Sequence, residues 1–231
     1  MRMVQEQFEN SKMKKIVMIL LSMCCITAHA QLSDVNVGDI VDIDGIKGIV
    51  FQVDETGSHG VLMSINCLRG ISGTWCNDKK IAKDMPVPKS ETDGRSNTQM
   101  VTEYAKSRNA LNKFPVFEWC AKLGEGWYIP SYKELEAFVN YWLGNEQIID
   151  WDSEEEVVIE DNRPFYKQVN EKMIEAGGVP FLNGVCTSTI NDDGKVYVFW
   201  FDRQKNSFSF KTWAKGGSFN KYIVGRAFYK F

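Results

Sequence analysis

The sequence of 231 residues has no hydrophobic run long enough to span a membrane. Its N-terminal apolar run, residues 16–26, is too short for a span. A Lys-Lys pair precedes this run, and Ala-His-Ala at 28–30 follows it as the small-x-small pattern that signal peptidase cleaves. We therefore expect residues 1–30 to be a secretory signal peptide, with Met13 as the true start and Gln31 as the mature N-terminus.

Histidine and basic charge are also scarce. One of the two histidines lies in the expected leader, so His59 alone remains. A single histidine excludes His-rich zinc sites, and any Ser-His-Asp mechanism would depend on one residue in a turn. The leader carries four basic and two acidic residues, so its removal changes the formal net charge from −3 to −5. A net acidic chain without a basic stripe argues against nucleic-acid binding.

Cysteine is limited to six residues, and the last four of them follow the leader: Cys67, Cys76, Cys120 and Cys186. In an oxidising compartment these four are disulfide candidates with three possible pairings. Cys67 and Cys76 bracket a short glycine-containing loop, which favours a local bridge, and a Cys120–Cys186 bridge would tie helices to the sheet. The alternative is that some are buried free thiols. No Cys-x-x-Cys motif occurs, which argues against redox catalysis.

Export places the protein outside the cytoplasm. We expect it to be secreted, periplasmic or at the cell surface. The stretch Leu-Ser-Met-Cys at 21–24 leaves lipid attachment at Cys24 as an open alternative. About 200 mature residues can bury one substantial core, so we expect a single domain over residues 31–231.

Hydrophobic patterning predicts strands, then helices, then strands. Three β-branched runs within 35–66, separated by Asp-Gly and Gly-rich turns, predict an N-terminal β-meander. Residues 66–99 are loop-rich, and a turn at 93–96 precedes an expected helix N-cap at Asn97 or Thr98. Helices are predicted at 98–111, 116–123, 131–143 and 164–176, a hairpin at 196–201 and 207–213, and a closing strand at 222–228. This order predicts an α+β domain with two or more packed helices and a mostly antiparallel sheet.

The segment 117–138 carries the most specific motif. A helix with a Cys-Ala pair stops at Gly-Glu-Gly, Trp-Tyr-Ile-Pro follows as a short strand, and Ser131 and Glu134 form a capping box that opens the next helix. This order of elements resembles a C-type-lectin-like domain. Two weaker matches, Cys-Thr-Ser-Thr at 186–189 and the closing strand at 222–228, resemble its bacterial branch, which includes C-terminal domains of collagen-like adhesins and formylglycine-generating-type proteins. The opening residues 37–60 are similar to exported proteins of gut-dwelling Gram-negative bacteria.

Several signatures of that family are missing here. Calcium-dependent sugar-binding members carry Glu-Pro-Asn or Gln-Pro-Asp, and neither tripeptide occurs in this sequence. Formylglycine-generating enzymes need a late cysteine pair, and no cysteine follows Cys186. The resemblance therefore implies neither a calcium site nor catalysis, and we expect no metal, no cofactor and no enzymatic activity.

The C-terminal hairpin carries the candidate binding residues. Residues of one parity, such as Phe199 on the first strand, are expected to face the core. The opposite face would then expose Trp200, with Arg203, Lys211 and Trp213 near it. Aromatic and cationic groups on one surface suit sugar rings, sulfated glycans or peptide partners. The alternative is that the sheet is covered on both faces and that Trp200 belongs to the core.

Together these features predict an exported, non-catalytic domain that binds a glycan or a surface protein. A structural subunit of a surface or fimbrial assembly is one alternative, and an enzyme related to the formylglycine-generating type is the other. The oligomeric state is left open.

Overall fold

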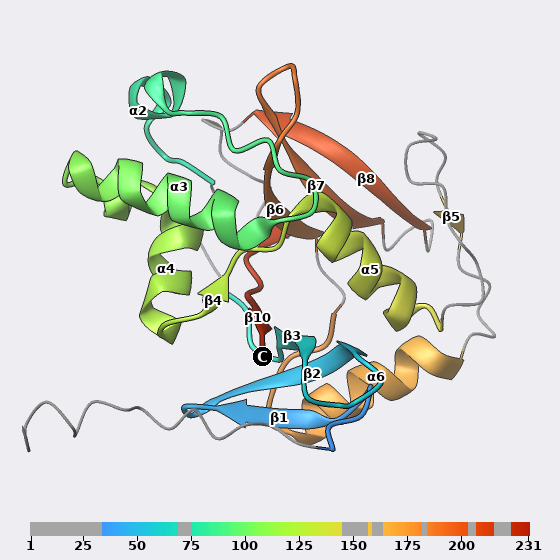
Figure 1. Ribbon diagram of the computed structural model, residues 1–231. Coiled ribbons are helices and arrows are strands. Elements are labelled where there is room, and N and C mark those ends of the chain that lie inside the picture. The colour runs from blue at the N-terminus through green and yellow to red at the C-terminus, as the bar shows by residue number, and fades with distance from the viewer. Residues whose placement is uncertain are drawn as a thin grey trace, which may run out of the picture. The chain divides into compact units, whose positions relative to one another are not determined.

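In the computed structural model, one β-sheet combines the N-terminal meander with the end of the chain. The structure describes residues 34–68, 75–144, 157–158, 164–181, 184–202, 207–214 and 223–231. The strand order of this sheet is β1-β2-β3-β10-β4, and all of its neighbours pair antiparallel. The strands are β1 (Ile40–Ile43), β2 (Ile46–Val53), β3 (Gly60–Ser64), β10 (Phe228–Lys230) and β4 (Trp127–Tyr128). The predicted meander at 35–66 is present as β1 to β3 (Figure 1).

A second sheet contains the C-terminal hairpin and has the order β5-β8-β7-β6-β9. Its pairs are antiparallel except for β6 and β9, which run parallel. The strands are β5 (Val157–Val158), β8 (Ser207–Ala214), β7 (Lys195–Asp202), β6 (Gly184–Ile190) and β9 (Ile223–Val224). The strands β7 and β8 confirm the predicted hairpin.

The helices come from the middle of the sequence. They are α2 (Lys79–Asp84), α3 (Gly94–Ser107), the 3-10 helix η1 (Leu111–Lys113), α4 (Pro115–Leu123), α5 (Tyr132–Trp142) and α6 (Pro164–Glu175). Helices beside mostly antiparallel sheets confirm the α+β class. The C-type-lectin-like assignment stays a prediction.

Local signals set the path from α4 to α5. Gly124 ends α4 with φ of +118°, a conformation that L side chains rarely adopt. The capping box then opens α5, where the Glu134 carboxylate accepts from the Ser131 N–H at 2.9 Å. The predicted helix, strand and second helix of this segment are therefore present.

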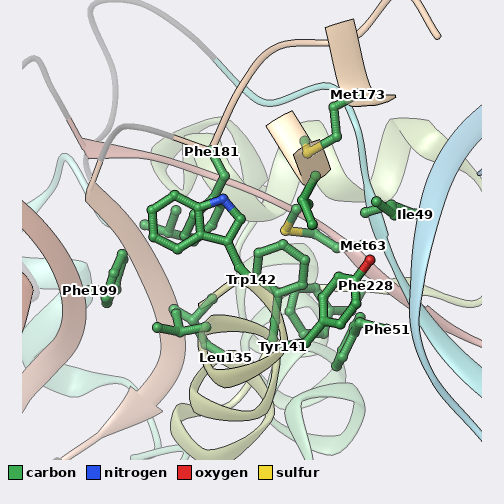
Figure 2. Packing of buried hydrophobic residues seen from close by; sticks show 14 of the residues in the cluster. Ile49, Phe51, Met63, Leu135, Tyr141, Trp142, Met173, Phe181, Phe199 and Phe228 are labelled. Carbon is green, nitrogen blue, oxygen red and sulfur yellow. The ribbon is translucent and has the colours of Figure 1, made fainter. Parts of the chain in front are cut away.

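The helix α5 supplies the centre of the hydrophobic core. Phe138 packs edge-on against Phe51 of the first sheet at 5.3 Å between ring centroids. Trp142 packs against Phe208 of the second sheet at 5.1 Å. Figure 2 shows Trp142 in the middle of the cluster, with Phe199 on one side and Phe51 on the other. One amphipathic helix thus contacts both sheets, which buries its apolar face completely.

Two predictions, the loop at 66–99 and the start of the helix expected at residue 98, are wrong. The loop-rich segment 66–99 contains α2, capped by the Asp78 side chain, which accepts from Lys80 N and Ile81 N. The helix α3 begins at Gly94 rather than at residue 98, and its N-cap is Asp93 rather than Asn97 or Thr98. Asn97 lies inside α3, and its side-chain oxygen, the atom that would cap, instead accepts from the Ser90 N–H at 3.2 Å.

The predicted closing strand at 222–228 is not one strand. Ile223–Val224 joins the second sheet as β9, whereas Phe228–Lys230 joins the first sheet as β10. Between them, the Arg226 side chain is 1% exposed and donates to backbone carbonyls of other segments. The chain therefore crosses from one sheet to the other at this point, and the buried guanidinium holds the crossing.

Several predictions concern residues outside the described ranges. They are the signal peptide at 1–30, lipid attachment at Cys24 and the position of Arg203. None of the helices in the described ranges has both the length and the apolar content needed to cross a membrane.

Candidate functional site

The hairpin β7–β8 has two chemically different faces. On the inner face, Phe199 and Phe208 are fully buried and stack at 5.4 Å with their planes 22° apart. Phe199 also stacks on Phe181, which joins this face to the α5 core. The predicted core parity of the hairpin is therefore confirmed.

The outer face carries Trp200, Lys211 and Trp213, which we call the hairpin face. The two indole rings are half-buried, with centroids 6.1 Å apart and planes tilted by 34°. Lys211 is exposed and shares the β8 face with Trp213 two residues further on. Val198, which pairs with Lys211 across β7 and β8, is fully buried. The outer face is thus covered at Val196 and Val198, but neither tryptophan is completely buried.

Small residues beside Trp200 make room for its ring. Ser209 is its cross-strand partner on β8. On the other side lies Gly184 of β6, where an added Cβ would come within 3.2 Å of Trp200 Cε3. A larger residue at either position would press against the indole. Trp200 therefore lies between two small neighbours, Gly184 and Ser209, which leave space for its indole ring.

This arrangement has a definite chemical capacity. Two tilted aromatic rings offer π faces, and the ammonium group of Lys211 adds three hydrogen-bond donors and a positive charge. Of the four predicted binding residues, the structure brings Trp200, Lys211 and Trp213 together, and Arg203 lies outside the described residues. Within the described ranges, no three His, Cys, Asp or Glu side chains are grouped so that they could hold a metal ion.

No disulfide bond joins Cys67, Cys76, Cys120 or Cys186, so the predicted bridges are absent among the described residues. Both ends of the 67–76 segment have other anchors. Leu68 N–H donates to the Gly225 carbonyl, whereas the Trp75 indole donates to the Thr187 carbonyl. Cys76, Cys120 and Cys186 are buried thiols, as the alternative to bridges predicts, and the Cys76 thiol donates to the Asp78 carbonyl at 3.3 Å.

Burial disfavours the thiolate form of Cys120 and Cys186. It raises the pKa of Cys186 to about 12 and raises the pKa of Cys120 as well. The thiolate is the reactive form, so neither group is poised for redox chemistry at neutral pH.

Thiol labelling is therefore expected to distinguish Cys67 from the others. In the folded chain without residues 1–30, Ellman's reagent should react quickly with the half-buried Cys67 alone, and four thiols should react after unfolding without reductant. Cys67→Ser should remove the fast phase and leave three thiols on unfolding. Fewer than four thiols in the unreduced, unfolded wild type would instead demonstrate a disulfide.

A polar junction at Glu134 is a feature that the sequence indicated only in part. Besides its capping role, the carboxylate accepts from Gly94 N at 2.9 Å and from the Tyr128 hydroxyl at 3.1 Å. Oε1, the oxygen that accepts from Tyr128, also lies 2.7 Å from Lys230 Nζ. One capping residue thus connects α3, α5, β4 and β10. The motif predicted its local bond, and the long-range partners come from the fold.

Comparisons with known proteins find little similarity. No protein-family model matches the chain, and neither does any curated protein. Among solved structures, a fimbrial protein from Bacteroides ovatus matches with a TM-score of 0.44 and 18% sequence identity. The match covers 75% of this chain, which spans 36% of the length of that protein.

Proposed function

We propose that this chain is an exported, non-catalytic binding protein that recognises a glycan through the hairpin face. The observation that carries the proposal is the pair of half-buried tryptophans, 6.1 Å apart beside an exposed lysine. Location at the cell surface and a C-type-lectin-like architecture belong to the same proposal.

Glycan rings fit this face for physical reasons. A sugar ring presents an apolar C–H surface that can cover an aromatic ring, and its edge carries hydroxyl groups that accept from an ammonium group. Both tryptophans stand on paired strands, so their orientation is set before the ligand arrives. Preorganised groups lose less conformational entropy on binding, which favours affinity from a small contact area. A surface protein is the alternative partner for the same rings.

Truncating either tryptophan is expected to weaken binding to glycans. We expect Trp200→Ala and Trp213→Ala each to lower affinity about thirtyfold or more, because truncating an aromatic anchor costs about 2 kcal/mol or more. The measurement is binding to a glycan array, followed by titration of the best glycan. Lys211→Gln should reduce binding to sulfated or carboxylated glycans more than binding to neutral ones.

Phe165→Ala supplies the matched control, since Phe165 is 37% exposed and lies on α6 outside the hairpin face. Its binding should equal that of wild type. Unchanged glycan binding by both tryptophan variants, each shown to be folded by circular dichroism, would contradict the proposal. The alternative partner would be favoured if wild type binds no glycan but binds a purified surface protein, and if both tryptophan variants lose that binding.

A further inference from the structure

A cleft lies between α3 and the turn that leads from α4 into β4, and none of its lining residues belongs to the hairpin face. Its volume is about 550 Å³, within the range of small-ligand sites in proteins. We call it the α3–β4 cleft, and the residues that line it include Arg95, Gln99, Thr102, Lys106, Glu125 and Trp127. All of its lining residues belong to the described part of the chain.

One wall is a polar stripe along α3. Arg95, Gln99, Thr102 and Lys106 follow one another at helical spacing, so they lie on a single face of the helix. Eleven residues at 1.5 Å each make this stripe about 16 Å long. The Gln99 amide donates to Glu103 Oε1 at 2.7 Å, which holds both side chains on this wall. Hydroxyl, amide, carboxylate and cationic groups therefore stand in one row.

The opposite wall and the floor are backbone and aromatic rings. An added Cβ at Gly124 would meet no atom within 4 Å, so the main chain is open to a ligand there. Trp127 is only 6% exposed and packs on Tyr229 at 5.3 Å. The Arg95 guanidinium lies 5.7 Å from the centre of the Tyr128 ring. The floor is thus a packed aromatic layer in which Tyr128 is covered and only a small part of Trp127 reaches the surface.

The charges of the cleft select against several ligand classes. Two cations, Arg95 and Lys106, are balanced by two carboxylates, Glu103 and Glu125. A polyanion such as a phosphate chain would gain little net attraction from charges that cancel, and a fully apolar ligand would strip water from all four charged groups. The balance suits a neutral ligand that is rich in both donors and acceptors.

Strand addition by a peptide is blocked beside the cleft. The Thr98 hydroxyl accepts from the Ile129 N–H at 2.9 Å and lies 3.2 Å from the Ile129 carbonyl oxygen, to which it donates. Both backbone groups that follow β4 are therefore already used. A peptide that extended the sheet would have to displace this threonine.

We propose that the α3–β4 cleft is a binding site for a neutral oligosaccharide. Its hydroxyl groups would exchange hydrogen bonds with the α3 stripe, while the ligand lies over the Gly124 backbone and the edge of Trp127. This site is separate from the hairpin face and does not depend on the function proposed for it.

The test uses an array of neutral oligosaccharides, with an array of pentapeptides as a second arm. Wild type should bind neutral oligosaccharides, and Thr102→Trp should lower the affinity for at least one of them about tenfold by filling the cleft. Gln99→Ala, at an exposed position that tolerates truncation, should lower the same affinity about threefold to tenfold. The double variant Trp200→Ala/Trp213→Ala should retain this binding, which separates the two sites.

Lys83→Ala is the control, because Lys83 is an exposed helical lysine outside the cleft. It should leave the affinity unchanged. The proposal is overturned if no neutral oligosaccharide signal depends on Thr102 and Gln99, or if only pentapeptides respond to these variants.

Discussion

Replacing Arg226 with methionine is expected to lower the free energy of unfolding by about 4 kcal/mol. Arg226 is 1% exposed, and its Nη1 donates to the carbonyls of Ser64 and Ile65 at 3.0 and 3.2 Å. Its Nη2 donates to Val179 and Pro180, both at 2.9 Å. Methionine matches the length of the side chain but donates nothing, so buried carbonyls would lose their partners at about 1–3 kcal/mol each.

The position of Arg226 explains why this loss affects the whole domain. The residue lies between β9 and β10, where the chain passes from the second sheet to the first. Its carbonyl partners come from the end of β3 and from the segment between α6 and β6. A planar guanidinium can serve two pairs of acceptors at once, whereas an ammonium group cannot reach all four. We therefore expect Arg226→Lys to cost about half as much.

Urea unfolding followed by circular dichroism measures both changes. Arg108→Met is the control, because Arg108 is exposed and its guanidinium lies 4.2 Å from the centre of the Tyr104 ring. Its cost should stay below about 1 kcal/mol. An Arg226→Met loss no larger than that of the control would show that the four carbonyls do not depend on the guanidinium.

Gly94→Ala is expected to destabilise the protein by about 3 kcal/mol, although helix propensity alone predicts the opposite sign. Gly94 is the first residue of α3, and in a helix interior alanine is favoured over glycine by about 0.5–1 kcal/mol. In the folded protein, an added Cβ would lie 2.5 Å from both the Ile129 oxygen and the Ser131 nitrogen. It would also approach Glu134 Oε2 within 2.6 Å.

Two of these three contacts, to Ile129 and Ser131, involve backbone atoms, which cannot rotate away as a side chain can. Relief requires α3 to move from the start of α5, and this weakens the bond of 2.9 Å between Gly94 N–H and the Glu134 carboxylate. Overpacking costs about 1–3 kcal/mol, and a hydrogen bond to a charged group contributes about 1.5–3 kcal/mol.

Ser96→Ala provides the comparison within the same helical turn, at an exposed position. Its effect should stay within about 0.5 kcal/mol in the same urea unfolding measurement. A Gly94→Ala variant as stable as wild type would mean that α3 and α5 can separate without cost.

Features that depend on nearby residues could be predicted from the sequence. The turn of the first hairpin lies at Asp44 and Gly45, which both have positive φ, as a tight two-residue turn requires. The capping box began α5 where expected, and alternation on β7 identified Phe199 as inward-facing. Each of these signals acts within a few residues of the chain, so it survives without knowledge of the fold.

Helix starts were less predictable where a long-range partner replaces a local one. Asn97 has the chemistry of an N-cap, yet it bonds to Ser90 and approaches β6, and Asp93 caps the helix in its place. The cysteines are a similar case, because their spacing allowed bridges, yet no disulfide joins the four described cysteines and three of them are buried.

By itself, the sequence determined the α+β class, the meander, the capped helix α5 and the inner face of the hairpin, because turn chemistry and periodicity are local. Only the tertiary structure decided that residues 223–230 divide between two sheets and that Arg226 serves four carbonyls. It also decided that Gly184 leaves room for Trp200 and that α3 forms a cleft with β4. These features join residues far apart in the chain, and such pairings are selected by the packing of whole elements rather than by neighbouring residues.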